Sequence, residues 1–202
     1  MPSKEREYRS LGSIGPGEAE YRASGHAATF ERYLLWKDPD GEEYYEQIDP
    51  EAFRGADMTD AVYRVDHAGQ VFCRTSAQSL TLWTDETGLA FDADLSRTAA
   101  ARAHHEDLVA GNYPKMSFAF TVAKEEWDRE TRTRIIRKFD KIYDVSPVSF
   151  PANPGTDISA RACLDGVIEA EKAERLEAAR KQEETRKRLA LRARTIERRF
   201  IP

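Results

Sequence analysis

Residues 111–122, GNYPKMSFAFTV, alternate between large apolar side chains and small ones. With a period of two, the large residues of this segment fall on one face of a β-strand: Met116, Phe118, Phe120 and Val122. The opposite face then carries Ser117, Ala119 and Thr121. The pattern predicts a strand with a strong core face and a second face that is small and weakly polar. The simplest interpretation of Ser117 is a small residue on a solvated or tightly packed face.

Short strand-like runs separated by turn residues recur along the chain before residue 163. The predicted strands cover residues 25–36, 61–67, 79–83, 89–95, 134–139 and 142–150. Residues 44–53 lead into a short helix or loop. The segment Thr-Asp-Glu-Thr-Gly between 79–83 and 89–95 is a hairpin signal. Residues 61–67 would place Tyr63, Val65 and His67 on one face.

One helix is predicted among these strands, over Arg97–Ala110, with Ser96 as its cap and Gly111 as its end. About six strands with one or two helices in this order predict a mainly β protein with flanking helices. The expected architecture is a closed or nearly closed antiparallel β-barrel.

The chain after residue 163 has a different character. Residues 164–202 contain no Gly after Gly166 and no Pro before Pro202, and they are rich in strong helix formers. Their apolar positions are too sparse for a firm heptad, which predicts a long solvated helix or a weak coiled coil that needs a partner. A polar helix that only solubilises the protein is the alternative. The expected domains are a flexible segment at 1–22, a barrel at 23–162 and a charged helical tail at 163–202.

Composition narrows the class of protein. The net charge of −5 argues against a general nucleic-acid binder, although residues 164–202 carry eleven basic and eight acidic side chains. Cys73 and Cys163 lie far apart without CxxC spacing, so neither a disulfide framework nor a zinc site is expected. The chain has no signal-peptide core and no run of 18 apolar residues. These features predict a cytosolic protein without membrane insertion.

Four histidines could serve as a base for a reactive serine. A serine hydroxyl is a poor nucleophile unless a base takes its proton and a third group orients that base. His26 opens a predicted strand. Adjacent helical residues diverge by about 100°, so His104 and His105 form no paired metal site and are expected on a solvated helix face. His67 ends an apolar strand face where a strand edge would meet a cleft.

The candidate third group lies in IYDVSPV, residues 142–148. Asp144 is the chief candidate, with Ser146 behind it on the same face. On residue type alone, His67 is more commonly a satisfied core histidine than a base. The local pattern does not establish that the strands of His67, Ser117 and Asp144 meet.

Several motifs in one order nevertheless carry a family resemblance. The segments VYRVDHAG, DETGLAFDADL, LVAGNYPKMSFAF and YDVSPVSFPANPGT follow one another, and GHAATF and IDPEAF both precede the first of them. Together they resemble the prohead serine proteases of tailed bacteriophages over roughly residues 24–161. That family is related in fold to the herpesvirus assembly proteases, so the resemblance implies a barrel ringed by helices.

The resemblance also implies roles for particular residues. The histidine of the first motif is the general base and the serine of the Met-Ser-Phe motif is the nucleophile, which correspond to His67 and Ser117. The family usually places an acid, often Glu, before its Val-Ser motif, and Asp144 stands at that position. By analogy with the herpesvirus enzymes, backbone N–H groups around Ala152 and Asn153 would bind the oxyanion. The alternative for this PANPG segment is that it simply turns the chain.

The implied function is a serine endopeptidase that needs no metal and no organic cofactor. Its substrates would be a scaffolding protein, or the scaffolding domain of the major capsid protein, and the protease itself. The protease would act as a homodimer inside the assembling procapsid, in the host cytoplasm. Two alternatives stay open, a non-catalytic assembly factor with a degenerate barrel and a cytosolic peptidase unrelated to capsids. The presence of His67, Ser117 and Asp144 argues against the former, and the charged tail argues against the latter.

Overall fold

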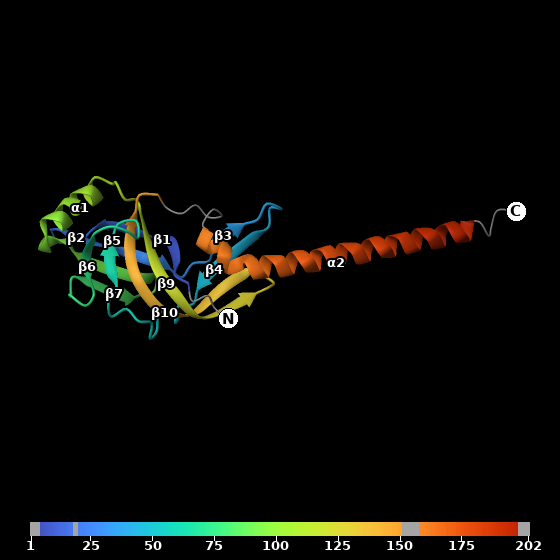
Figure 1. Cartoon of the computed structure of the whole chain (residues 1–202), viewed down its shortest axis with the longest axis horizontal. Helices are drawn as coiled ribbons and strands as arrows, with labels where there is room; N and C mark the ends of the chain where they lie inside the picture. Colours follow the sequence, from blue (N-terminus) through green and yellow to red (C-terminus); the bar gives the residue numbers. More distant parts are fainter. Residues whose placement is uncertain (1–4, 18–19, 151–157, 198–202) are drawn as a thin grey trace. The chain divides into compact units, whose positions relative to one another are not determined.

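The computed structural model describes residues 5–17, 20–150 and 158–197. The chain divides into two units, Met1–Arg161 and Ala162–Pro202. The first unit is mostly β, and its strands join in one 10-stranded sheet (Figure 1). The second unit consists largely of one helix, α2 (Ile158–Glu197), which matches the predicted charged helix as far as Glu197. Neither described α-helix is both long enough and apolar enough to cross a membrane.

The strands of the first unit alternate with short turns. Their bounds are β1 (Glu7–Pro16), β2 (Arg22–Thr29), β3 (Tyr33–Lys37), β4 (Glu43–Ile48), β5 (Val62–Arg64), β6 (Val71–Arg74), β7 (Leu80–Thr84), β8 (Gly88–Asp94), β9 (Lys115–Asp128) and β10 (Thr133–Val148). A 3-10 helix, η1 (Leu95–Arg97), and a helix, α1 (Ala99–Val109), lie between β8 and β9.

The sheet is open, so the predicted closed or nearly closed antiparallel barrel is wrong. Its strands follow the order β3-β4-β10-β9-β1-β2-β8-β7, with β5 paired to β10 and β6 paired to β5. No pairing joins β3 to β7 within the described residues. Nor is the sheet wholly antiparallel, because β10 runs parallel to both β4 and β5. Hydrophobic period two marks the buried face of a strand but does not select its neighbours.

Strand β1 lies within residues 1–22, where a flexible segment was expected. It pairs with β2 on one side and with β9 on the other, and so joins the two halves of the sheet. The buried side chains near its start belong to Glu7 and Arg9. Because these residues are charged, no apolar alternation marks the strand in the sequence.

Other predicted elements are shifted or split. Residues 25–36 form two strands, β2 and β3, whereas residues 134–139 and 142–148 belong to the single strand β10. The predicted β7–β8 hairpin is confirmed. Helix α1 begins two residues later than expected, because Thr98 rather than Ser96 caps it by accepting a hydrogen bond from the Ala101 N–H. Gly111 follows the helix with a φ of +80°, as a helix-ending glycine does.

The core lies against the Met116–Val122 face of β9, as the alternation predicted. Phe118, Phe120 and Phe139 are fully buried and their rings contact one another, with Phe53 packed on Phe118 and Phe139. The opposite face of β9, which carries Ser117, is buried as well. Small side chains there are therefore a packing requirement, not a sign of solvent exposure.

Helix α1 packs through a buried histidine. His104 is 4% exposed, stacks on Phe72 with 4.7 Å between ring centroids, and shares a hydrogen bond of 3.1 Å with the Tyr63 hydroxyl. Burial lowers the pKa of His104 to about 4, because it disfavours the charged imidazolium. The expectation of a solvated face is thus wrong for His104, since residue type alone does not reveal its aromatic neighbours.

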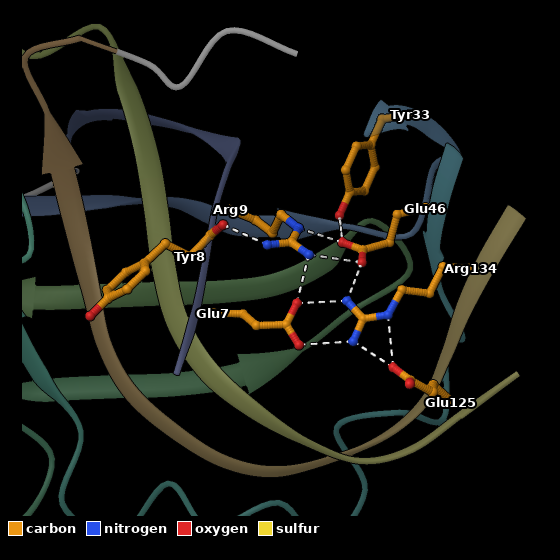
Figure 2. A network of polar contacts seen from close by, with 7 residues as sticks. All are labelled: Glu7, Tyr8, Arg9, Tyr33, Glu46, Glu125 and Arg134. Atoms are coloured by element: carbon orange, nitrogen blue, oxygen red, sulfur yellow. Dashed lines mark hydrogen bonds and ion pairs between the residues drawn. The ribbon is translucent and has the colours of Figure 1, made fainter. Parts of the chain in front are cut away.

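A buried ion cluster joins the start of β1 to β4, β9 and β10 (Figure 2). The Glu46 carboxylate accepts from Arg9 Nε at 2.6 Å and from Arg134 Nη1 at 2.6 Å, and it also accepts from the Tyr33 hydroxyl. Glu7 bridges the same two guanidinium groups at 2.7 and 2.6 Å. Each buried charge therefore has partners of opposite sign, which is the condition for tolerating its desolvation.

The pKa of the Glu46 carboxyl shows how strong the electrostatic interactions within the cluster are. Complete burial on its own would raise the pKa of this group, but the charges of Arg9 and Arg134 outweigh burial and lower the pKa to about 2. Its carboxylate therefore stabilises the folded chain above the pKa of about 4.3 in the unfolded state. This stabilisation is lost as the pH falls from there towards about 2.

We expect Glu46→Ala to lower the free energy of unfolding by about 3–5 kcal/mol, because it leaves Arg9 and Arg134 buried without their central partner. Urea denaturation at neutral pH measures this loss. The matched control is Glu125→Ala, because the Glu125 side chain is 29% exposed and pairs with Arg134 at the rim of the cluster. The control substitution should lower the free energy of unfolding by about 1 kcal/mol. Equal losses of unfolding free energy in the two variants would contradict the central role of Glu46. The difference in unfolding free energy between wild type and Glu46→Ala should also become smaller below about pH 4, and a constant difference would contradict that role as well.

Candidate active site

Two long antiparallel strands position the predicted serine and acid. The pairing of β9 with β10 places Ser117 opposite Ser146, and Ala119 opposite Asp144. Residues directly opposite in a sheet share a face, so all four side chains lie on the same side. Ser117, Asp144 and Ser146 are each at most 2% exposed.

His67 reaches this face from a turn and not from a strand. Strand β5 ends at Arg64, so the prediction that His67 shares a strand face with Tyr63 and Val65 is wrong. Asp66 and His67 have φ values of +48° and +55°, in the left-handed region that side chains other than glycine rarely adopt. Such conformations cost of order 1–3 kcal/mol each and persist only where surrounding contacts impose them.

Contacts from the end of β10 impose this turn. The Asp66 carboxylate accepts from the Ser149 N–H at 2.9 Å and from the Ser149 hydroxyl at 2.7 Å. The Asp66 N–H donates to the Pro147 carbonyl at 3.0 Å. The turn that carries His67 is therefore tied to the strand that carries Asp144. Sequence reasoning missed Asp66 and Ser149, and the only available signal was the turn-forming character of Asp66 and Gly69 in VDHAG.

The structure brings the three predicted residues into one hydrogen-bonded chain. Ser117 Oγ lies 2.6 Å from His67 Nε2, and His67 Nδ1 lies 2.6 Å from Asp144 Oδ1. The Ser146 hydroxyl donates to the same Asp144 oxygen at 2.8 Å. The imidazole keeps 17% of its surface exposed, whereas the Asp144 side chain keeps 2%. A buried carboxylate thus faces one ring nitrogen, and the hydroxyl faces the other.

Ala119 explains why this face of β9 is small. It lies opposite Asp144 on β10 and two residues along β9 from Ser117. The imidazole of His67 extends between Ser117 and Asp144. A large side chain at position 119 would compete with the imidazole for this space. The small residues around Ser117 therefore make room for a ring that arrives from a distant turn.

This arrangement can activate a hydroxyl for attack on a carbonyl carbon. A hydroxyl within hydrogen-bonding reach of an imidazole, itself oriented by a carboxylate, is the geometry of nucleophilic serine catalysis. Cys73 offers no alternative nucleophile, because burial raises the pKa of its thiol to about 12. No group of three or more metal-binding side chains occurs in the described part of the chain. The proposed oxyanion residues Ala152 and Asn153 lie outside the described residues.

A hydrogen-bonded serine, histidine and aspartate on a β scaffold is the arrangement typical of serine hydrolases. A family model described as caudovirus prohead serine protease matches residues 13–168. This protein therefore belongs to the caudovirus prohead serine protease family, which implies a serine protease with a role in capsid maturation. No curated protein and no solved structure matches the chain. The expected relation to the herpesvirus protease fold stays a prediction.

Proposed function

We propose that this protein is a serine endopeptidase that cleaves the scaffolding protein, or the scaffolding domain of the major capsid protein, during procapsid maturation. Membership of the prohead protease family supports the setting. The observation that carries the proposal is the chain of contacts Ser117–His67–Asp144, with 2.6 Å at each step. The enzyme would act in the host cytoplasm, inside the assembling procapsid.

In the proposed acylation step, His67 Nε2 takes the proton of Ser117 Oγ while that oxygen attacks the carbonyl carbon of the scissile peptide bond. The imidazolium then gives this proton to the nitrogen of the leaving amine as the C–N bond breaks, which leaves an acyl group on Ser117. A water molecule enters next and gives a proton to His67 while its oxygen attacks the ester. Return of that proton to Ser117 Oγ frees the acid product.

Asp144 would keep the Nδ1 proton on His67 and stabilise the imidazolium formed in each half-reaction. Its burial strengthens this effect, since charges interact more strongly where water is excluded. The oxyanion that develops on the substrate needs N–H donors. We assign this role to the backbone of Ala152 and Asn153. The mechanism uses no metal and no organic cofactor.

We further propose that helix α2 directs the protease to the scaffold and is then removed by the protease in trans. Ion pairs within α2, Glu177–Lys181 and Glu183–Lys187, join its turns at i,i+4 spacing. The segment Arg188–Pro202 carries five arginines against a single acid, Glu197, and so suits an acidic partner. Packing many copies into one procapsid would raise the local concentration and favour dimerisation and cutting in trans.

Co-expression with the capsid and scaffold proteins of the same phage tests the function. Mass spectrometry of the assembled particles should find a cleaved scaffold and a protease shortened at its C-terminal end. Both changes should be absent with Ser117→Ala. Equal processing with Ser117→Ala would instead favour a non-catalytic assembly factor, the alternative function.

A variant that ends at Ala162 tests the role of the tail separately. It should keep the melting temperature of the first unit and the cleavage of a free peptide, because the sheet and the site lie within residues 1–161. It should fail to enter procapsids. Normal incorporation, or unfolding of the truncated chain, would contradict this account of the tail.

A further inference from the structure

Strand β1 brings an aromatic side chain to the imidazole of His67. The rings of Tyr8 and His67 lie with their centroids 4.6 Å apart and their planes at 62°, an edge-on arrangement. Such aromatic contacts favour one relative orientation of the rings. Tyr8 lies within the segment expected to be flexible, so sequence reasoning did not single it out.

The register of the sheet places Tyr8 in a row with residues already assigned to the site. Tyr8 pairs with Ala119 across β1 and β9, and Ala119 pairs with Asp144 across β9 and β10. The small side chain of Ala119 separates the phenol ring from the carboxylate. Ser117 and Asp144 hold the two nitrogens of the His67 imidazole, and Tyr8 contacts the ring itself.

The backbone of Tyr8 is fixed from the other face of β1. Glu7 and Arg9, the residues on either side, point into the buried ion cluster, while Tyr8 points away from it (Figure 2). Arg9 Nη1 also donates to the Tyr8 carbonyl at 2.8 Å. Because neighbouring side chains of a strand alternate between faces, anchoring Glu7 and Arg9 sets the position of the Tyr8 ring.

We propose that Tyr8 is a positioning residue for the catalytic imidazole. Its ring restricts the rotation of the His67 side chain and so keeps Nε2 directed at Ser117 Oγ. His67 needs such a restraint, because it projects from a turn and not from a strand. The inference rests on the proposed function, since it assumes that His67 acts on Ser117.

The test compares Tyr8→Ala with Tyr8→Phe in the full-length protein, using a cleavable peptide and a fluorophosphonate probe that acylates reactive serines. Tyr8→Ala should lower kcat about 10- to 100-fold with KM nearly unchanged, because misdirecting a catalytic group slows the chemical step. The rate constant for labelling Ser117 should fall by the same factor. Tyr8→Phe keeps the ring that contacts His67, so its kcat and its labelling rate constant should both stay within about threefold of the wild-type values.

Three outcomes would overturn the assignment. If Tyr8→Ala raises KM and leaves the labelling rate unchanged, Tyr8 contacts the substrate and does not position His67. If Tyr8→Phe is as slow as Tyr8→Ala, the hydroxyl and not the ring is responsible. Unchanged rates in both variants exclude any role in catalysis. If Tyr8→Ala does not fold, Tyr8→Thr removes the ring while keeping a β-branched residue suited to a strand.

Failure of the proposed function gives a different result. A wild-type protein that the probe does not label at Ser117 contradicts the serine protease mechanism itself. Labelling of the wild type and of Tyr8→Ala at equal rates contradicts only the role of Tyr8.

Discussion

Ser117→Ala is expected to abolish cleavage of the scaffold, with kcat reduced by about 10⁴- to 10⁶-fold. The change removes the oxygen that lies 2.6 Å from His67 Nε2 and, in the proposed mechanism, forms the bond to the substrate. His67→Ala should have a similar effect, since the remaining hydroxyl then has no base. Residues that act as one catalytic unit contribute non-additively, so the double variant should be no slower than either single one.

Turnover of a labelled scaffold peptide and the melting temperature of each variant test this expectation. Ser117 is a small side chain, and its loss should leave the fold intact. Ser76→Ala is the matched control, because its exposed hydroxyl contacts Asp60 outside the site. A rate within about a hundredfold of wild type for Ser117→Ala, with contaminating proteases excluded, would contradict the assignment of the nucleophile.

Asp144→Asn should lower kcat by about 10²- to 10⁴-fold, a smaller loss than that expected for Ser117→Ala or His67→Ala. The neutral amide cannot stabilise the imidazolium that forms when His67 takes the serine proton. If the amide nitrogen faces His67 Nδ1, it also favours the wrong tautomer, with the proton on Nε2 where the base must accept. The measurement is kcat at neutral pH on the same peptide.

Ser146→Ala is the comparison for this prediction. Its hydroxyl donates to Asp144 Oδ1 at 2.8 Å, so its loss removes one hydrogen bond to the carboxylate and leaves the negative charge in place. We expect less than about a tenfold decrease in kcat. If Ser146→Ala proves more damaging than Asp144→Asn, the third member of the site has been misassigned.

The local sequence pattern was sufficient to predict those elements that are specified by a few neighbouring residues. Alternation in GNYPKMSFAFTV predicted the core face of β9, because side chains in a strand point alternately to its two faces. The turn residues between 79–83 and 89–95 predicted the β7–β8 hairpin for a similar local reason. The ordered motifs that contain His67, Ser117 and Asp144 indicated the family and named the three residues that the fold then brings together.

Tertiary structure alone determined how these elements pack and pair, and in two places the result differs from what the hydrophobic pattern predicts. Strand β1 buries Glu7 and Arg9, whose charges are compatible with burial only because Glu46 and Arg134 arrive from distant strands. His67 lies in a left-handed turn and not in its expected strand, and contacts with Ser149, the residue after β10, impose this turn. The sequence itself determined which residues could do chemistry and which strand faces are apolar. The open sheet, the parallel pairing of β10 and the place of Tyr8 beside His67 depend on partners far along the chain, which no local periodicity encodes.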